Sequence, residues 1–334
     1  MSAPFSWIKP EPWGIHIEPA DVWVDPGRAV DRALVTHGHA DHARGGHGET
    51  VATPETLAIM KLRYATSDGA KPVEYGETIR LGGGVDATYI PAGHVLGSAQ
   101  ILLEHAGERV IVTGDYKRRS DPTCPPFQVT PCDIFITEAT FGLPVFTHPP
   151  IEEEMAKLLK ALADNPDRCV LVGAYALGKA QRVIAELRRS GHTAPIYLHG
   201  AMEKMCRLYE EHGIDLGELR LVADHTKDEM RGSIVICPPS ALNDRWSRRL
   251  PEPITAMASG WMRVRQRARQ RNVELPLVIS DHADWDELTR TIEEVDAEEN
   301  WITHGREDAL LRWCQLGQRR ARALALVGRE DEDE

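Results

Sequence analysis

Four potential metal ligands are grouped near the N-terminus of this 334-residue chain. The segment VTHGHADHARGG contains His37, His39, Asp41 and His42. Alternate histidines on an extended segment point to one side, whereas the loop that follows can turn Asp41 and His42 toward a second point. Imidazole and carboxylate ligands without thiolate suit zinc, manganese or iron. We therefore expect a metal site in which one ion does not bind all four side chains; the alternative is a set of surface histidines on a glycine-rich loop.

Short strands are predicted to position these residues and three others. A strand pattern leads into Asp25 in IHIEPADVWVDPG, into the histidine segment, into His94 in DATYIPAGH and into Asp115 in RVIVTGDY. Reactive residues at strand ends are the usual result of building a site on a rigid sheet. A helix is predicted in TPETLAIMKLRYA, because Thr53 is a suitable cap and Pro54 fits the first helical position.

From about Pro149 the pattern changes to alternating strands and helices. CVLVGAY and PIYLHG are typical of buried strands, and IEEEMAKLLKALADN, GKAQRVIAELRRSG and EKMCRLYEEHG are typical of helices. This alternation predicts a parallel sheet covered by helices. Nearer the C-terminus, LPLVISDHADWDEL and NWITHGREDALLRWCQLG each predict a strand, a loop and a helix.

The composition indicates a soluble protein with a sizeable core. Apolar residues make up 42% and charged residues 27% of the chain, and no apolar run approaches the ~20 residues of a membrane helix. The first residues lack the features of a signal peptide, so a cytoplasmic location is expected. The six cysteines form no Cys-x-x-Cys pair, so we expect small core residues rather than a disulfide framework or a thiolate zinc site.

The net charge of −12 argues at first against a nucleic-acid partner. The charge is unevenly distributed, however, because residues 245–271 contain eight arginines and one acidic residue, Glu252. This segment could face an anion; the alternative is a solvated helix face. We single out Arg263, Arg265 and Arg267 as candidate nucleic-acid contacts.

The pattern His-x-His-x-Asp-His resembles the signature of the metallo-β-lactamase fold superfamily. Asp25, His94 and Asp115 follow the order of further motifs of that family. The resemblance implies an αββα sandwich that binds two divalent metal ions, zinc or manganese, with Asp25 bracing the metal loop. It implies one metal set of His37, His39 and His94, a second of Asp41, His42 and a final histidine, and Asp115 between them. The final histidine is either His282 or His304.

Either histidine lies well over 150 residues beyond Asp115, which implies an inserted domain. This arrangement resembles the β-CASP branch, which consists of nucleases with an inserted α/β domain. Glu138 in ITEATFG, His282 in SDHADW and His304 in WITHGRED match its motifs. The resemblance implies that His304 completes the second metal set, and that His282 faces the scissile phosphate and is oriented by Glu138. Lys179, in a turn that resembles the insert's strand-to-helix turn, would bind phosphate at an exposed helix N-terminus.

The expected domains follow from this resemblance. Residues 1–147 and 273–328 would form the metallo-β-lactamase domain, residues 148–272 the β-CASP insert, and residues 329–334 a disordered acidic tail.

The chain length and the segments HIEPADVWVDP and ASGWM resemble bacterial DNA exonucleases encoded beside an ATP-dependent DNA ligase and a helicase. The resemblance implies hydrolysis of single-stranded DNA from its 5′ end in DNA repair, by a water that two metal ions activate and that attacks next to Asp41, His282 and Glu138. Three alternatives remain: a β-CASP ribonuclease that processes RNA 3′ ends, a small-molecule metallohydrolase, and a non-catalytic protein that clamps DNA ends for a ligase.

Overall fold

A computed structural model describes residues 5–64, 69–324 and 326. The predicted acidic tail at 329–334 lies outside these residues. The chain divides into two compact units, each described by itself. Unit 1 contains the chain up to Thr147 and the segment from His282 onward, and unit 2 contains His148–Asp281.

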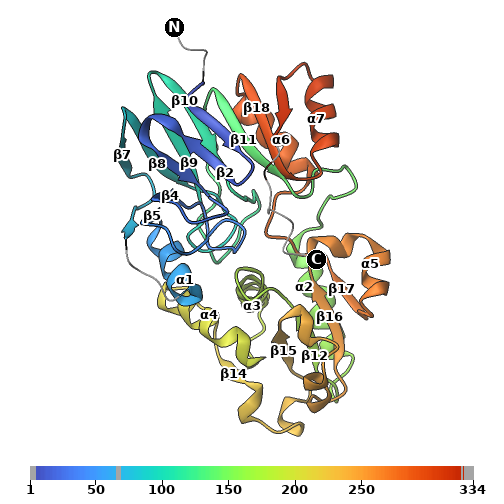
Figure 1. Cartoon of the computed structure of the whole chain (residues 1–334). Coiled ribbons are helices and arrows are strands. Elements are labelled where there is room, and N and C mark those ends of the chain that lie inside the picture. The colour runs from blue at the N-terminus through green and yellow to red at the C-terminus, as the bar shows by residue number, and fades with distance from the viewer. Residues whose placement is uncertain (1–4, 65–68, 325, 327–334) are drawn as a thin grey trace. The chain divides into compact units, whose positions relative to one another are not determined.

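Unit 1 is built on two sheets (Figure 1). The first has the order β1-β2-β3-β4-β5-β6, with strands at Ile8–Glu11, Gly14–Ile17, Val22–Val24, Arg32–Leu34, Glu49–Ala52 and Ala70–Pro72. The second has the order β19-β18-β11-β10-β9-β8-β7, with strands at Ala321–Ala323, Glu299–Gly305, Ile134–Ala139, Glu108–Val112, Ala99–His105, Val85–Pro91 and Thr78–Gly82. The core between them takes side chains from both sheets, among them Ile15, Ile17, Ile101 and Leu103. The two sheets therefore pack face to face.

Helices cover the outer faces of both sheets in unit 1. Helix α1 (Pro54–Tyr64) places Met60 against Ala33 of β4 and against Val35, which directly follows that strand. Helices α6 (Trp285–Val295) and α7 (Glu307–Leu316) pack on the other face of the second sheet, near Phe135. The layers are thus helix, sheet, sheet and helix, which confirms the αββα sandwich.

Two predicted helix starts have the local chemistry that the sequence indicates. The Thr53 Oγ1 accepts a hydrogen bond from the Thr56 N–H, directly before Pro54 opens α1. Asp284 and Glu287 form a reciprocal capping box at the start of α6. This cap fixes the point at which the chain leaves the loop that contains His282.

Unit 2 is a parallel six-stranded sheet with the order β14-β13-β15-β12-β16-β17. The strands lie at Leu219–Leu221, Ile196–Leu198, Ile234–Cys237, Val170–Gly173, Ile254–Ala258 and Leu275–Leu277. Its helices are α2 (Ile151–Ala163), α3 (Lys179–Arg189), α4 (Gly200–Glu211) and the short α5 (Arg265–Gln270). The unit extends to Asp281 rather than to 272, because β17 pairs in parallel with β16.

Many of the apolar side chains of the described residues are buried in these cores. None of the helices in the described part of the chain has the length and apolarity needed to cross a membrane. Of the six cysteines, Cys124 is half-buried and the other five are buried thiols.

Candidate metal centre

Asp25 connects the end of β3 to the histidine segment. Its carboxylate accepts hydrogen bonds from the Thr36 N–H at 2.8 Å and from the Thr36 hydroxyl at 2.6 Å. The same carboxylate lies 2.8 Å from Nδ1 of His42, and both side chains are fully buried. This contact favours a proton on Nδ1 of His42 and leaves Nε2 as the ligand atom, which is the usual way an outer carboxylate orients a metal-binding histidine.

Four buried side chains converge in a first group of potential ligands. His37, His39, His94 and Asp115 each offer an atom within 4.8 Å of the others. His94 Nε2 lies 2.9 Å from His39 Nδ1, and His37 Nε2 lies 3.4 Å from an Asp115 oxygen. Segments that are 57 residues apart in sequence, at 37 and 94, thus meet at one point because β4 and β8 bring their ends together.

A second group shares Asp115 with the first. Asp41, His42 and Asp115 also offer atoms within 4.8 Å of one another. His42 Nε2 lies 3.4 Å from a carboxylate oxygen of Asp41 and 3.4 Å from one of Asp115. Asp115 therefore stands between two potential metal positions.

The ligand atoms fit divalent metal ions. Among the described residues, Nε2 of His37 and Nε2 of His42 are buried and have no hydrogen-bond partner. Buried polar atoms in folded proteins nearly always have a hydrogen-bond partner or a bound ligand, so these two nitrogens are available to bind a metal ion. Imidazole and carboxylate donors match zinc or manganese.

The electrostatics of the groups also favour a bound cation. Burial, together with the neighbouring His42 and His94, lowers the pKa of His37 well below its ordinary value, so this imidazole is neutral and able to bind metal. For His42, burial acts to lower the pKa, but Asp115, Asp41 and Asp25 outweigh it and raise the pKa to about 9. Burial raises the pKa of Asp115. A bound metal ion would take the place of the proton that these carboxylates otherwise attract to His42.

Glu138 and His282 form a pair beside these groups. Glu138 is fully buried at the end of β11 and accepts a hydrogen bond from the Tyr116 N–H at 2.8 Å. Its two carboxylate oxygens lie 3.2 and 3.1 Å from Nδ1 of His282. The same nitrogen lies 4.0 Å from Asp115, so the pair adjoins the shared carboxylate.

His304 lies next to the second group without joining it. Its ring stacks on His42, with 5.2 Å between ring centroids. None of the groups found within 4.8 Å among the described residues contains His304. Glu138 pairs with Thr303 and Ala139 with Gly305, so His304 is the extra residue of a β-bulge in β18, with a φ of 61°.

The candidate nucleic-acid contacts in unit 2 differ in exposure. Lys179 opens α3 but is 3% exposed, and its Nζ lies 3.6 Å from an Asp281 oxygen. It therefore sits in a buried ion pair rather than at an exposed helix end. Arg263 and Arg265 are exposed, and Arg267 is half-buried with its guanidinium 4.1 Å from the Trp261 ring centroid.

Two residues that hydrogen-bond to the potential ligand segments, Thr36 and Ser98, were not predicted from the sequence. The Thr36 hydroxyl contacts Asp25 and lies 3.1 Å from Nδ1 of His37. The Ser98 hydroxyl accepts hydrogen bonds from the N–H groups of His94 and Val95 at 3.1 and 3.2 Å. The sequence signal that could have identified them is a hydroxyl residue close to a potential ligand: Thr36 precedes His37, and Ser98 follows His94 by four residues.

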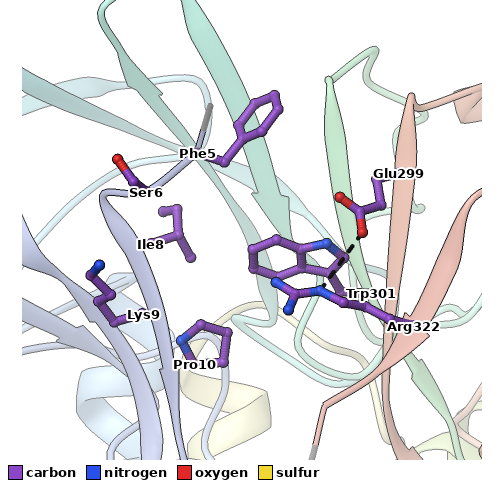
Figure 2. Close-up of a pocket in the computed structure, with 8 residues that line it drawn as sticks. All are labelled: Phe5, Ser6, Ile8, Lys9, Pro10, Glu299, Trp301 and Arg322. Carbon is purple, nitrogen blue, oxygen red and sulfur yellow. Dashed lines mark ion pairs between the residues drawn. The ribbon is translucent and has the colours of Figure 1, made fainter. Parts of the chain in front are cut away.

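A separate cavity in unit 1 contains none of the predicted site residues. Figure 2 shows it between β1 and the strands β18 and β19, lined on one side by Ile8 and Pro10 and on the other by Trp301 and Arg322. Arg322 lies over the Trp301 ring at 3.8 Å and pairs with Glu299 at 3.7 Å. Lys9 also lines this cavity and pairs with Glu18 at 3.8 Å, and none of the potential metal ligands is among the lining residues.

Comparison with known proteins agrees with this arrangement. Residues 13–173 match the family model described as the metallo-beta-lactamase superfamily. A solved structure of a protein of unknown function from Enterococcus faecalis superposes with a TM-score of 0.57 at 13% identity, over 82% of this chain and 74% of that one. This likeness concerns the fold.

Three curated relatives illustrate the proteins to which the chain is similar. A probable DNA ligase of Opitutus terrae is 31% identical over 298 residues, which cover 87% of this chain and 28% of the ligase. A ribonuclease of Thermus thermophilus is 29% identical over 53% of this chain and 48% of its own length. An endoribonuclease of Mycosarcoma maydis is 29% identical over 53% of this chain and 25% of its own. The chain thus spans from about a quarter to about half of the length of these relatives.

Proposed function

Because this chain contains a metallo-β-lactamase superfamily domain, we propose that it is a metal-dependent nuclease that hydrolyses phosphodiester bonds of DNA. The observation that carries the proposal is that Asp115 belongs to both histidine-rich ligand groups and also lies within 4.8 Å of ligand atoms of Glu138 and His282. Phosphodiester hydrolysis needs an activated water, stabilisation of the phosphoryl oxygens and a proton for the leaving oxygen. The described residues supply a candidate for each need.

Two divalent ions, zinc or manganese, would be held by the two groups. One group is His37, His39, His94 and Asp115, and the other is Asp41, His42 and Asp115 with His304 beside it. Bound ions of this kind lower the pKa of water and offset the charge of a phosphoryl group. Asp25 keeps Nδ1 of His42 occupied, so that Nε2 stays directed to the ligand position.

His282 is the proposed proton donor to the leaving oxygen. The Glu138 carboxylate accepts a hydrogen bond from the Nδ1–H of His282 and so orients the ring. The other ring nitrogen then carries the exchangeable proton when the ring is charged, a role suited to a histidine near neutral pH. The Tyr116 N–H fixes the carboxylate in turn.

DNA is the proposed substrate because of the relatives. The protein named a probable DNA ligase aligns with 87% of this chain, including the arginine-rich segment, whereas the ribonucleases align with 53%. Unit 2 is proposed to be a β-CASP domain whose Arg263, Arg265 and Arg267 contact the phosphate backbone. We extend the proposal to 5′-to-3′ digestion of single strands in the cytoplasm during DNA repair, together with an ATP-dependent ligase and a helicase.

The test uses matched single strands of DNA and RNA, each labelled separately at the 5′ and 3′ ends, with manganese or zinc. Immediate release of the labelled 5′ nucleotide from DNA is the expected result. Preferential cleavage of RNA would make the protein a ribonuclease, which the similarity to endoribonucleases favours as the second candidate. The control is Asp41→Ala, which removes a ligand and is expected to abolish cleavage of either strand. Intact DNA and RNA with metal-loaded wild type would contradict the proposal.

A further inference from the structure

An arginine in the loop that follows Asp115 contacts the start of the helix that follows His282. Arg119 is four residues beyond Asp115. Asp284 caps α6 and is two residues beyond His282. A guanidinium nitrogen of Arg119 contacts a carboxylate oxygen of Asp284, and its Nε lies 3.2 Å from an oxygen of Glu287. We call Arg119, Asp284 and Glu287 the α6 clamp. It joins two loops of unit 1, one carrying Asp115 and the other His282.

The two carboxylates of the α6 clamp divide their oxygens between the helix cap and Arg119. Asp284 Oδ1 accepts a hydrogen bond from the Glu287 N–H at 3.0 Å, and its Oδ2 contacts Arg119. Glu287 Oε2 accepts a hydrogen bond from the Asp284 N–H at 3.2 Å, and its Oε1 faces Arg119. Both carboxylates are buried, and buried charges need a partner of opposite sign. Removal of the Arg119 guanidinium therefore weakens the cap itself.

Backbone contacts connect the same two loops. The Ala283 N–H donates a hydrogen bond of 2.6 Å to the Tyr116 carbonyl, so the residue after His282 is joined to the residue after Asp115. The Tyr116 N–H donates in turn to Glu138, which contacts Nδ1 of His282. Because two residues of chain span at most about 7 Å, a shift of the start of α6 is passed on to His282 and changes its distance from Glu138.

We infer that Arg119 is a positioning residue for the proposed reaction, and that through the α6 clamp it keeps the ring of His282 against Glu138 and beside Asp115. This inference rests on the proposed nuclease function, in which His282 protonates the leaving oxygen. A proton donor works only within hydrogen-bond distance of its acceptor, and a displacement of about 1 Å can cost about 100-fold in rate. Loss of the clamp therefore slows the reactions that need His282.

The first test compares two substrates that differ in their need for a proton donor. The leaving oxygen of DNA is an alkoxide that needs a proton, whereas bis(p-nitrophenyl) phosphate releases a stable phenolate. Manganese-loaded Arg119→Ala is expected to have a kcat on single-stranded DNA about 10- to 100-fold below that of wild type. Its loss on the small diester is expected to be much smaller. Arg119→Lys keeps the charge without the planar fork that reaches both carboxylates, and is expected to be intermediate.

Arg118 provides a matched control on the same helix. Its guanidinium donates a hydrogen bond to the Thr291 hydroxyl at 2.8 Å and contacts Glu294, both further along α6. Arg118→Ala therefore removes the same charge and another attachment of α6, but leaves the cap next to His282 intact. It is expected to lower the urea unfolding midpoint, as Arg119→Ala does, and to keep the wild-type kcat on DNA. This comparison separates positioning from a general loss of stability.

A cavity beside the α6 clamp permits a chemical rescue. The three clamp residues line this cavity together with Arg290, and 32% of the Arg119 side chain is exposed. Guanidinium ions added to Arg119→Ala can therefore reach the two carboxylates. At concentrations too low to unfold the protein, they are expected to restore part of kcat on DNA. Sodium chloride at the same ionic strength is expected to restore none.

A measurement without substrate follows the position of His282 directly. In zinc-loaded protein labelled with 15N-histidine, the Nδ1–H signal of His282 is assigned by its loss in His282→Asn. Slow exchange of this proton with water reports its hydrogen bond to Glu138. Faster exchange is expected in Arg119→Ala, and the wild-type exchange rate is expected in Arg118→Ala.

The outcomes distinguish this inference from the proposed function. A loss on DNA that exceeds the loss on the small diester, that guanidinium reverses and that Arg118→Ala does not show supports the clamp. Wild-type kinetics for Arg119→Ala, equal losses on both substrates, or the same losses in Arg118→Ala overturn the clamp. Each of these results leaves the nuclease function intact if the wild type digests DNA. A wild type that cleaves no polynucleotide overturns both.

Discussion

Single residues around the metal ligands decide whether the ligands are available. Asp25 is fully buried, and three donors converge on it from Thr36 and His42. It also has a φ of 46°, a conformation that aspartate and asparagine tolerate better than most residues. Asp25 thus accepts several hydrogen bonds around the histidine segment and also adopts the left-handed backbone conformation that this turn needs.

Replacing Asp25 tests that role. Asp25→Ala leaves buried donors without a partner and is expected to lower metal affinity about 10- to 100-fold and the free energy of unfolding by about 2–4 kcal/mol. Asp25→Asn keeps the shape and one acceptor, and is expected to lose less on both counts. Metal titration by calorimetry and urea unfolding are the measurements. An alanine variant with wild-type metal affinity would show that Asp25 does not orient His42.

Glu138→Gln tests the orientation of His282. The amide keeps an acceptor for the Tyr116 N–H but removes the negative charge opposite Nδ1 of His282. We expect kcat on DNA to fall about 100-fold or more, with unchanged metal content by atomic absorption. Hydrolysis of bis(p-nitrophenyl) phosphate is expected to fall much less, since p-nitrophenolate leaves without a proton donor. Equal losses on both substrates would contradict a role in leaving-group protonation.

The cysteines provide a prediction that depends on pH. Burial raises the pKa of five thiols, to about 12 for four and to about 11 for the fifth: Cys132, Cys169, Cys206, Cys237 and Cys314. A raised pKa lowers the thiolate fraction at any given pH, and the thiolate is the reactive form. Iodoacetamide at pH 8 is therefore expected to label Cys124 first, as read by peptide mass spectrometry. All six are expected to react in urea, and rapid labelling of the buried five in the native protein would contradict their burial.

At the scale of secondary structure, strand ends place the ligands. Most of this arrangement could be predicted from the sequence, because apolar strand patterns end within three residues of Asp25, His37, His94 and Asp115. The bulge at His304 could not be predicted. It depends on the register between β11 and β18, two strands that are more than 150 residues apart in the chain, and no local pattern fixes that register.

Lys179 in unit 2 also shows that contacts between residues far apart in the chain could not be predicted from local sequence patterns. The strand-to-helix turn was visible in the sequence, and α3 begins at Lys179 as expected. The burial of its side chain against Asp281 depends on a residue about a hundred positions away. The boundary of unit 2 likewise depends on the pairing of β17 with β16.

A substitution at Gly305 tests the importance of the β-bulge at His304. Gly305 has a φ of 83°, and a Cβ there would overlap the backbone of Ala139 and Thr140. Gly305→Ala is expected to cost about 2–4 kcal/mol of unfolding free energy and to weaken metal binding by displacing His304, whose ring stacks on that of the potential ligand His42. Gly107 is the matched control, since it has a φ of 88° in the β9–β10 hairpin and no atom within 4 Å of a built Cβ. Gly107→Ala is expected to cost only about 1 kcal/mol. Equal costs would show that the close backbone contact at Gly305 is unimportant.

At the scale of the whole molecule, the potential metal ligands grouped by geometry among the described residues all belong to unit 1. Removal of metal is therefore expected to act on one unit. We compare the protein loaded with metal at a concentration well above its Kd with the same protein after chelation by EDTA. Chelation is expected to lower the unfolding midpoint of unit 1 by about 5–15 °C. A calorimetric scan would show this as a shift of one of two transitions, reversed by zinc or manganese. Equal shifts of both transitions would contradict the assignment of the metal to unit 1 alone.

The position of Asp115 in both histidine-rich ligand groups would link the binding of two ions thermodynamically. The first ion would order the carboxylate that the second ion also needs, and its positive charge would oppose the binding of the second. The affinity of each position would then depend on the occupancy of the other, and by reciprocity the coupling would be the same in either order of binding. A metal titration of such a site would follow one coupled binding curve and not the sum of two independent isotherms.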